Sequence, residues 1–415
     1  MAKREFDLVL YGATGFVGAL TAKYLSRVGG SARVALAGRS VDKVREVRNG
    51  LGESARSWPI IEADAGSPAS LAAMATRTQV VITTVGPYTR YGLPLVAACV
   101  DAGTDYADLS GETPFIRASI DRFHKQAADA GVRIVHSCGF DSVPSDLTVY
   151  ALWGRARADG QGELTSTNMV VQKFVGGASG GTLASILEAR RAMSNDPDVR
   201  HAMVDPYTLS TDRNAEPDLG RQSDAQLRRG VRIAPELKGS WTGAFVMAAE
   251  NSRIVRRSNA LLHWSYGRQF RYAEQASAGS SVLAPVTAVV STAVLAGILG
   301  LGGRYANKAT GVLERVLPKP GTGPSESSLA KGQYRIETYA TTATGARYRA
   351  VMAQQGDPSY IATAVLLGQS GLALALDRDR LTDLRGVLTP AAAMGEVLLT
   401  RLPDAGVSFE TVRLN

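Results

Sequence analysis

Cysteine and histidine are scarce in this chain, whose 415 residues include only two cysteines, Cys99 and Cys138, and four histidines. The two thiols lie far apart and the histidines are scattered, so the sequence predicts no metal site. Two thiols are also too few for a disulfide framework. Met1 to Glu5 lead directly into an apolar segment, without the basic and apolar regions of a secretion signal. We therefore expect a reduced, cytoplasmic setting.

Long basic arms and stacking-aromatic patterns are also missing, although the formal net charge is +8. Nucleic-acid binding is therefore not expected. The basic residues are spread along the chain in short clusters, and such a surface suits an anionic cofactor, an acidic carrier protein or a membrane. A chain of this length predicts at least two domains.

Charge is absent from one long segment, residues 275–303. Its apolar part, Val282 to Leu301, has about the length that a membrane span needs, but it contains Pro285 and several hydroxyl and glycine residues. Three interpretations stay open: a buried or oligomer-interface helix, a membrane-surface or lipid-facing element, and a true span. A homodimer and a peripheral lipid contact accordingly stay open as well.

The first motif lies near the N-terminus. An apolar strand pattern (residues 6–11) is followed by the glycine-rich sequence GATGFVG and then by a helical segment. In such a turn, backbone amides approach a pyrophosphate at the positive end of a helix. The spacing is a variant of the usual fingerprint, but the strand–turn–helix context supports dinucleotide binding. The predicted cofactor-binding residues here are Gly12, Thr14, Gly15, Phe16, Val17 and Gly18.

Strand and helix patterns alternate from there to about residue 150. They include a helix expected from Leu93 to Ala102 and a strand that contains His136, which is expected to be a core histidine. The alternation predicts an α/β protein whose N-terminal domain, residues 1–150, is a Rossmann-type doubly wound parallel sheet. Residues 151–355 are expected to form a mixed α+β domain for substrate binding or oligomerisation, including a hairpin that turns at Thr344-Gly345. Residues 356–415 are expected to be helices that pack back on the first domain.

The end of the second predicted strand reads Gly38-Arg39-Ser40, without the carboxylate that would bind the ribose hydroxyls of NAD. Arg39 and Ser40 suit a 2′-phosphate instead, so NADPH is favoured over NADH. The alternative is that Arg39 ends the strand, is exposed to solvent and binds no cofactor.

Three further strand ends supply candidate chemistry. Gly86 and Pro87 are expected beside the cofactor, and Tyr88 and Tyr91 are candidate catalytic phenols that could donate a proton or bind an oxyanion. For either tyrosine taken alone, ordinary aromatic packing is the favoured role. Asp141, after a later strand, is a further catalytic candidate, although it and Asp108 could simply cap helices.

Motifs at these strand ends resemble those of the saccharopine dehydrogenase-like reductases: residues 12–18, 36–39, 85–88, 106–112 and 138–146. The similarity continues through Gly180-Gly181-Thr182 and residues 318–324 to residues 386–390, and so covers essentially the whole chain. Within that family the chain most resembles the trans-acting enoyl reductases of phthiocerol-type lipid synthesis.

This resemblance implies NADPH-dependent reduction of an α,β-unsaturated thioester that a polyketide synthase carries. It implies hydride addition at the β-carbon and protonation at the α-carbon, and it carries over no catalytic residue. Two alternatives stay open, a saccharopine-type reductase of an imine or amino-acid adduct and a non-catalytic NADP-binding protein on a membrane or lipid.

Overall fold

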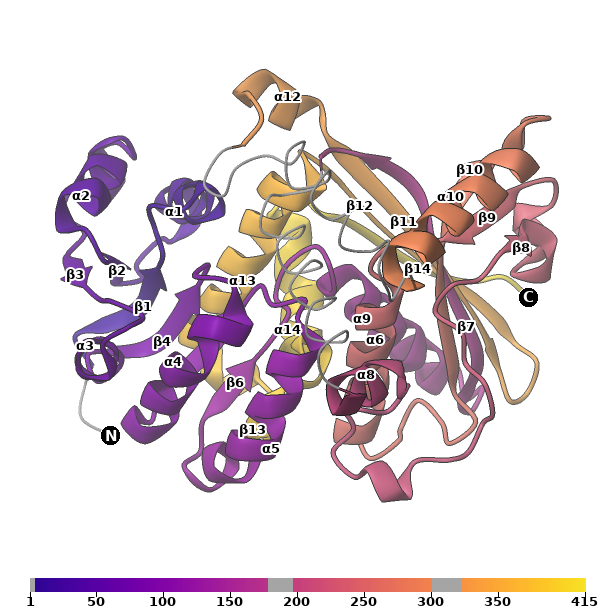
Figure 1. The fold of residues 1–415 in the computed structure, drawn as a ribbon, viewed down its shortest axis with the longest axis horizontal. Helices are drawn as coiled ribbons and strands as arrows, with labels where there is room; N and C mark the ends of the chain where they lie inside the picture. Colours follow the sequence, from indigo (N-terminus) through magenta and orange to yellow (C-terminus); the bar gives the residue numbers. More distant parts are fainter. Residues whose placement is uncertain (1–3, 178–196, 301–322) are drawn as a thin grey trace.

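The computed structural model describes residues 4–177, 197–300 and 323–415. Two seven-stranded sheets, A and B, form its framework, and Figure 1 shows them side by side. Sheet A has the order β13-β6-β5-β4-β1-β2-β3, and every neighbouring pair is parallel. Its strands are β1 (Phe6–Tyr11), β2 (Val34–Gly38), β3 (Ile60–Glu62), β4 (Thr78–Thr83), β5 (Asp105–Asp108), β6 (Arg133–Val135) and β13 (Gly386–Leu388).

Sheet A is parallel because its strands are apolar on both faces and helices connect them. Leu8, Val9 and Leu10 on β1 are all fully buried, although their side chains alternate between the two faces. The helices of this half are α1 (Phe16–Val28), α2 (Val41–Asn49), α3 (Pro68–Ala75), α4 (Tyr88–Ala102) and α5 (Thr113–Asp129), with the short helix η1 (Glu53–Ala55). The predicted doubly wound sheet is thus confirmed.

The seventh strand of sheet A comes from the other end of the chain. After η5 (Pro358–Ala362), helix α13 (Thr363–Leu376) contacts β1, β4 and β5, and β13 then pairs with β6. Helix α14 (Pro390–Asp404) follows, and β14 (Ser408–Arg413) pairs with β12 of sheet B. The C-terminal part therefore contributes a strand to each sheet, whereas the sequence indicated only helices.

Sheet B is mixed and has the order β14-β12-β11-β7-β10-β9-β8. Only β7 and β10 are paired in parallel. Its remaining strands are β7 (Leu164–Val175), β8 (Arg228–Arg229), β9 (Trp241–Ala244), β10 (Arg271–Gly279), β11 (Gln333–Thr342) and β12 (Arg347–Gln355). The predicted hairpin is β11–β12, with Gly345 at φ +86° in its turn.

Helices join the two sheets in layers. α13 lies on sheet A, α14 contacts α13, and α6 (Val143–Ala158) lies between α14 and strands β11 and β12. Figure 1 shows α13 and α14 in yellow between the two sheets. The other helices of this half are α8 (Pro197–Val204), α9 (Ala248–Leu261), α10 (Ala284–Gly300) and α12 (Glu326–Lys331), with the short helices η2 (Arg213–Ala215), η3 (Gly230–Arg232), η4 (Pro235–Leu237) and η6 (Arg378–Arg380).

Within the uncharged segment, Ala284–Gly300 form helix α10, and the residues at the start of the segment belong to β10. Helix α10 lies along β9 near the edge of sheet B (Figure 1). Among the described residues, one helical stretch, Pro358–Leu376, is long and apolar enough to cross a membrane, but 83% of its apolar 18-residue window is buried inside the protein. It is therefore a core helix. Side chains of α10 are described as far as Leu295, and several valines among them are exposed.

Candidate active site at the carboxyl edge of sheet A

The glycine turn has the geometry that close phosphate approach requires. Gly12 adopts φ +92°, which disfavours any residue with a side chain. A Cβ on Gly18 would overlap the carbonyl oxygen of Gly12, so α1 lies directly on the turn. The N-cap of α1 is Gly15, which has no side chain that could cap the helix. The first turn of α1 contains no acidic residue. The helix therefore presents its positive end without a competing carboxylate.

Residues at the end of β2 fit the adenosine end of a dinucleotide. Arg39 is exposed and forms no ion pair with any residue that the structure describes. Ser40 is the N-cap of α2, where its Oγ accepts a hydrogen bond from the Lys43 amide at 3.4 Å. Accepting leaves the hydroxyl proton of Ser40 available to a phosphate oxygen.

The segment from Gly86 onward is a helix start rather than an open loop. The sequence indicated a helix from Leu93, but α4 begins at Tyr88 with Pro87 as its N-cap. The Glu112 carboxylate accepts from the amides of Tyr88 (2.9 Å) and Thr89 (2.7 Å), and from the Thr89 hydroxyl. Glu112 therefore occupies the positive end of α4, which is unavailable to a phosphate.

Tyr88 and Tyr91 lie in different environments. The Tyr88 side chain is buried, stacks on Phe115, donates a hydrogen bond to the Thr83 carbonyl and accepts one from the Leu109 amide, both at 3.2 Å. Burial raises the pKa of Tyr88 well above its usual value. This arrangement favours the packing role for Tyr88. Tyr91 is half-buried, with the Arg90 guanidinium over its ring.

Asp108 belongs to a buried network rather than to an open site. Its carboxylate accepts hydrogen bonds from the Ser110 amide and the Tyr106 hydroxyl, and it contacts His136 Nδ1 at 2.7 Å. The other ring nitrogen of His136 lies 2.9 Å from Ser119 Oγ, which completes a Ser–His–Asp order that the sequence did not suggest. Because all three residues are at most 1% exposed, no substrate can reach them, and His136 is a core histidine as predicted.

Asp141 is the site residue with the most unusual electrostatics. It follows β6, precedes α6 and is half-buried. Its carboxylate makes no hydrogen bond to another described residue, so it does not cap α6. Burial alone raises the pKa of Asp141 to about 6. A carboxyl with a pKa near 6 is protonated in mildly acidic solution, and in that form it can donate a proton to a substrate.

Aromatic side chains from both sheets line the neighbourhood of Asp141. Phe140 lies 4.6 Å from Tyr334 and 5.8 Å from Phe174, measured between ring centroids. Phe174, at the end of β7, is 42% exposed. The loop that carries Asp141 therefore packs, through Phe140, against apolar rings of sheet B, of which Phe174 is partly exposed.

The start of α13 ties this acid to the glycine turn. Tyr360 of η5 makes an edge-on contact with Phe16, with 5.0 Å between ring centroids, and Thr363 Oγ1 accepts from the Phe140 amide at 3.1 Å. Between the glycine turn on β1 and Asp141 after β6 lie two strands, β4 and β5. At about 5 Å per strand, roughly 15 Å separate them along this edge, which is the direction in which the nicotinamide half of a dinucleotide would extend from the turn.

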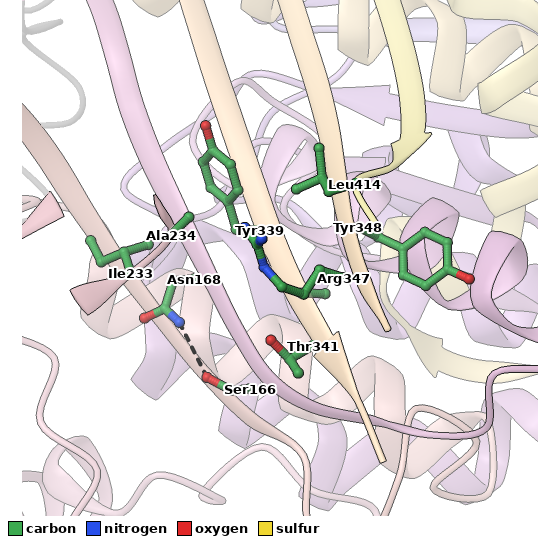
Figure 2. Close-up of a pocket in the computed structure, with 10 residues that line it drawn as sticks. Ser166, Asn168, Ile233, Ala234, Tyr339, Thr341, Arg347, Tyr348 and Leu414 are labelled. Carbon is green, nitrogen blue, oxygen red and sulfur yellow. Dashed lines mark hydrogen bonds between the residues drawn. The ribbon is translucent and has the colours of Figure 1, made fainter. Parts of the chain in front are cut away.

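A pocket elsewhere in the molecule lies outside this site. Figure 2 shows it on sheet B, where Asn168 bonds to Ser166. These residues share the face of Tyr339, opposite the face that α6 covers. The sequence motifs at Gly180-Gly181-Thr182 and residues 318–322 lie outside the described residues.

Sequence reasoning missed two residues that build the site. Thr84 Oγ1 donates to the Gly12 carbonyl at 3.1 Å and thereby supports the glycine turn from the end of β4. Thr363 holds the loop of Asp141 from a helix more than 220 positions away. Thr84 could have been identified from the sequence by its place at the end of a predicted strand. Nothing in the sequence near Thr363 indicates that it belongs to the site.

Comparisons with known proteins decide the family. A model of the saccharopine dehydrogenase NADP-binding domain matches residues 8–135. A trans-acting enoyl reductase of Mycobacterium ulcerans (strain Agy99) is 60% identical over 416 residues, covering 100% of this chain and 99% of its own. This chain belongs to the trans-acting enoyl reductases. A protein of Mycobacterium tuberculosis (strain H37Rv) is 66% identical over 412 residues, which are 99% of this chain and 98% of that protein.

Among solved structures, apo saccharopine dehydrogenase (L-Glu forming) from Saccharomyces cerevisiae matches with a TM-score of 0.54 over 98% of this chain and 99% of that one. At 13% identity this likeness concerns the fold alone. The predicted saccharopine dehydrogenase-like architecture is confirmed.

This enoyl reductase is an NAD(P)H-dependent oxidoreductase, and its N-terminal domain is of the NADP-binding type. The residues present fit NADPH on structural grounds: the uncapped start of α1 suits the pyrophosphate, and Arg39 has its charge free for a 2′-phosphate. Glycines 12, 15 and 18 would hold the pyrophosphate region, with Arg39 and Ser40 at the adenosine end.

Proposed function

We propose that this enoyl reductase reduces the α,β-double bond of an acyl thioester carried by a polyketide synthase in lipid biosynthesis. Relatives at 60% identity over their full length bear the name trans-acting enoyl reductase, which supports a partner synthase that supplies the substrate. The apolar rings packed against the loop of Asp141 support an acyl substrate, and the net charge of +8 suits an acidic carrier domain.

The observation that carries the chemistry is the half-buried carboxyl of Asp141 at the carboxyl edge of sheet A, whose pKa burial raises to about 6. NADPH, when bound, supplies a hydride to the β-carbon of the substrate. Asp141 would then give its proton to the α-carbon, so that one hydride and one proton saturate the double bond. The rings of Phe140, Phe174 and Tyr334 would exclude water from the acyl chain. Tyr91 is the second candidate for a donor, at the thioester oxygen.

Kinetics with an enoyl thioester and NADPH test this assignment. We expect Asp141→Asn to lower kcat by about a hundredfold or more, the usual effect of losing a general acid. The matched variant Tyr91→Phe should change kcat by less than about threefold. Because the acid must be protonated, kcat/KM for the parent enzyme should fall as pH rises above about 6.

The opposite result, a large loss in Tyr91→Phe and none in Asp141→Asn, would assign the proton to Tyr91. Oxidation of NADPH only with a 2-oxo acid and an amino acid, and never with an enoyl thioester, would replace this proposal with the saccharopine-type reaction.

Cofactor choice has its own test at Arg39. We expect Arg39→Ala to weaken NADPH binding by about tenfold or more while leaving NADH binding nearly unchanged, because only NADPH carries the 2′-phosphate. Fluorescence titration with each cofactor measures both affinities. Equal losses for the two cofactors would contradict the role given to Arg39.

A further inference from the structure

Small residues hold helix α10 to strand β9 of sheet B over the part whose side chains are described. A Cβ on Gly243 of β9 would lie 2.8 Å from Thr292 Oγ1 and 2.9 Å from the Ala288 carbonyl oxygen, so the helix sits directly on the strand. Thr292 Oγ1 also accepts from the Ala244 amide at 2.9 Å. Ala284 and Ala288, which face inward, are fully buried. The face of α10 that carries Ala284, Ala288 and Thr292 therefore makes this contact, and its valines lie on the other side of the helix.

The opposite face of α10 is apolar and exposed. Val282, at the entry to the helix, is 96% exposed, and Val286, Val289, Val290 and Val294 are 48–58% exposed. No charged residue occurs anywhere in α10, and the polar groups on its exposed side are the small hydroxyls of Thr287 and Ser291. A helix that is apolar all round normally lies in a protein core or a membrane, and a contiguous exposed patch of this kind marks an interaction surface.

Arginines border this patch at the edge of sheet B. Arg228 and Arg229 on β8 pair with Thr242 and Trp241 on β9, and the Arg229 guanidinium lies 5.2 Å from the centroid of the Trp241 ring. Trp241 precedes Gly243 by two residues on the strand and therefore points to the side on which α10 lies. Figure 1 shows β8, β9 and α10 together at this end of the molecule.

These arginines are not neutralised by any acidic residue that the structure describes. Arg228, Arg229 and Arg232 surround a surface hollow with Leu227 and Val231, both of which are more than 40% exposed. None of the three guanidiniums forms an ion pair across residues 4–177, 197–300 and 323–415. The combination of exposed valines, a half-buried tryptophan and unpaired arginines is typical of surfaces that bind the interface of an anionic bilayer.

We propose that the exposed face of α10, together with Trp241 and the arginines of β8 and η3, docks this enoyl reductase onto an anionic lipid surface. The valines enter the acyl region, Trp241 lies at headgroup level, and the arginines contact lipid phosphates. An anionic surface complements the arginines, whereas a second copy of the chain would bring further unpaired arginines to the same contact. This inference goes beyond the proposed reaction and does not depend on it.

Vesicle co-sedimentation of the full chain, without cofactor or substrate, tests the proposal. We expect binding to vesicles of phosphatidylcholine with phosphatidylglycerol and at least tenfold weaker binding to phosphatidylcholine alone. The double variant Val286→Ser with Val290→Ser should lower the partition coefficient at least tenfold, because the apolar contact is lost. Arg229→Glu with Arg232→Glu should abolish the preference for anionic vesicles.

Matched controls are Val204→Ser, at a valine that is 66% exposed on α8, and Arg122→Glu, at an exposed arginine on α5. Both should bind vesicles like the parent, and all variants should keep the parent melting temperature and its activity on a short soluble thioester. Failure of the parent to bind anionic vesicles would overturn the proposal. So would a dimer in gel filtration that the valine substitutions dissociate, since a second copy would then cover α10.

Discussion

Helices α13 and α10 have similar apolar compositions, but α13 is enclosed by the protein and α10 is exposed on one face. Neither contains a charged residue, and each approaches its sheet through a glycine: a Cβ on Gly371 of α13 would lie 2.8 Å from Ile82 on β4, and Gly243 of β9 makes the corresponding contact with α10. α13 is then covered by α1 and α14, whereas α10, as far as the described residues show, is covered on one side only, by β9 and β10. Apolar composition therefore indicates that the surface of a helix must be buried against something. Only the topology shows whether other elements of the same chain bury it.

The largest expected difference between the two helices is in stability. Leu367 of α13 is fully buried, so Leu367→Ala should lower the free energy of unfolding by about 2–5 kcal/mol through lost contacts and a cavity. Val290→Ala on the exposed face of α10 should change it by less than about 0.5 kcal/mol. Urea unfolding measures both values. Similar losses at the two positions would mean that α10 is covered in solution.

A smaller effect is expected at the contact between α10 and β9. Gly243→Ala places a methyl group against the Ala288 carbonyl oxygen and should destabilise this contact by about 1–3 kcal/mol. Because α10 lies at an edge, the loss should be local: its amides should exchange hydrogen faster, while those of α13 keep their protection. Hydrogen-exchange mass spectrometry reads the two helices separately. Faster exchange throughout the chain would show that α10 is part of the core.

The smallest effect concerns a buried charge between the two sheets. Glu250 of α9 accepts hydrogen bonds from the amide and hydroxyl of Thr113 on α5, and burial raises its pKa to about 7. Between about pH 4.5 and 7 the folded state therefore holds a proton that the unfolded state has lost, so stability should fall as pH rises through this window.

Glu250→Gln removes this titration and keeps both bonds to Thr113, since Glu250 Oε1 has no partner among the described residues. We expect a shallower fall of the melting temperature between pH 5 and 8. The slope should not vanish, because burial also raises the pKa values of Asp146 and Glu274 to about 7. An unchanged slope would show that Glu250 is ionised in the folded protein.

Local patterns predicted much of sheet A and its glycine turn. Strands β1, β2 and β4 are short apolar runs that each end in turn residues, and the glycine spacing of residues 12–18 reflects contacts made within that same stretch. The start of α4 was placed five residues too late because Glu112, which caps it, comes from another strand end. The buried role of Tyr88 likewise depends on β5 and α5.

The amino-acid sequence alone determined the parallel sheet, the site for a dinucleotide and the resemblance to enoyl reductases, because these depend on residues close together in the chain. The tertiary structure decided that Asp108 and Glu112 are satisfied by hydrogen bonds, and that Asp141 has no hydrogen-bond partner among the described residues. It also decided that α13 is enclosed and α10 is exposed. The physical reason is that solvation and hydrogen bonding of a side chain depend on neighbours from distant segments, which only the folded chain brings together.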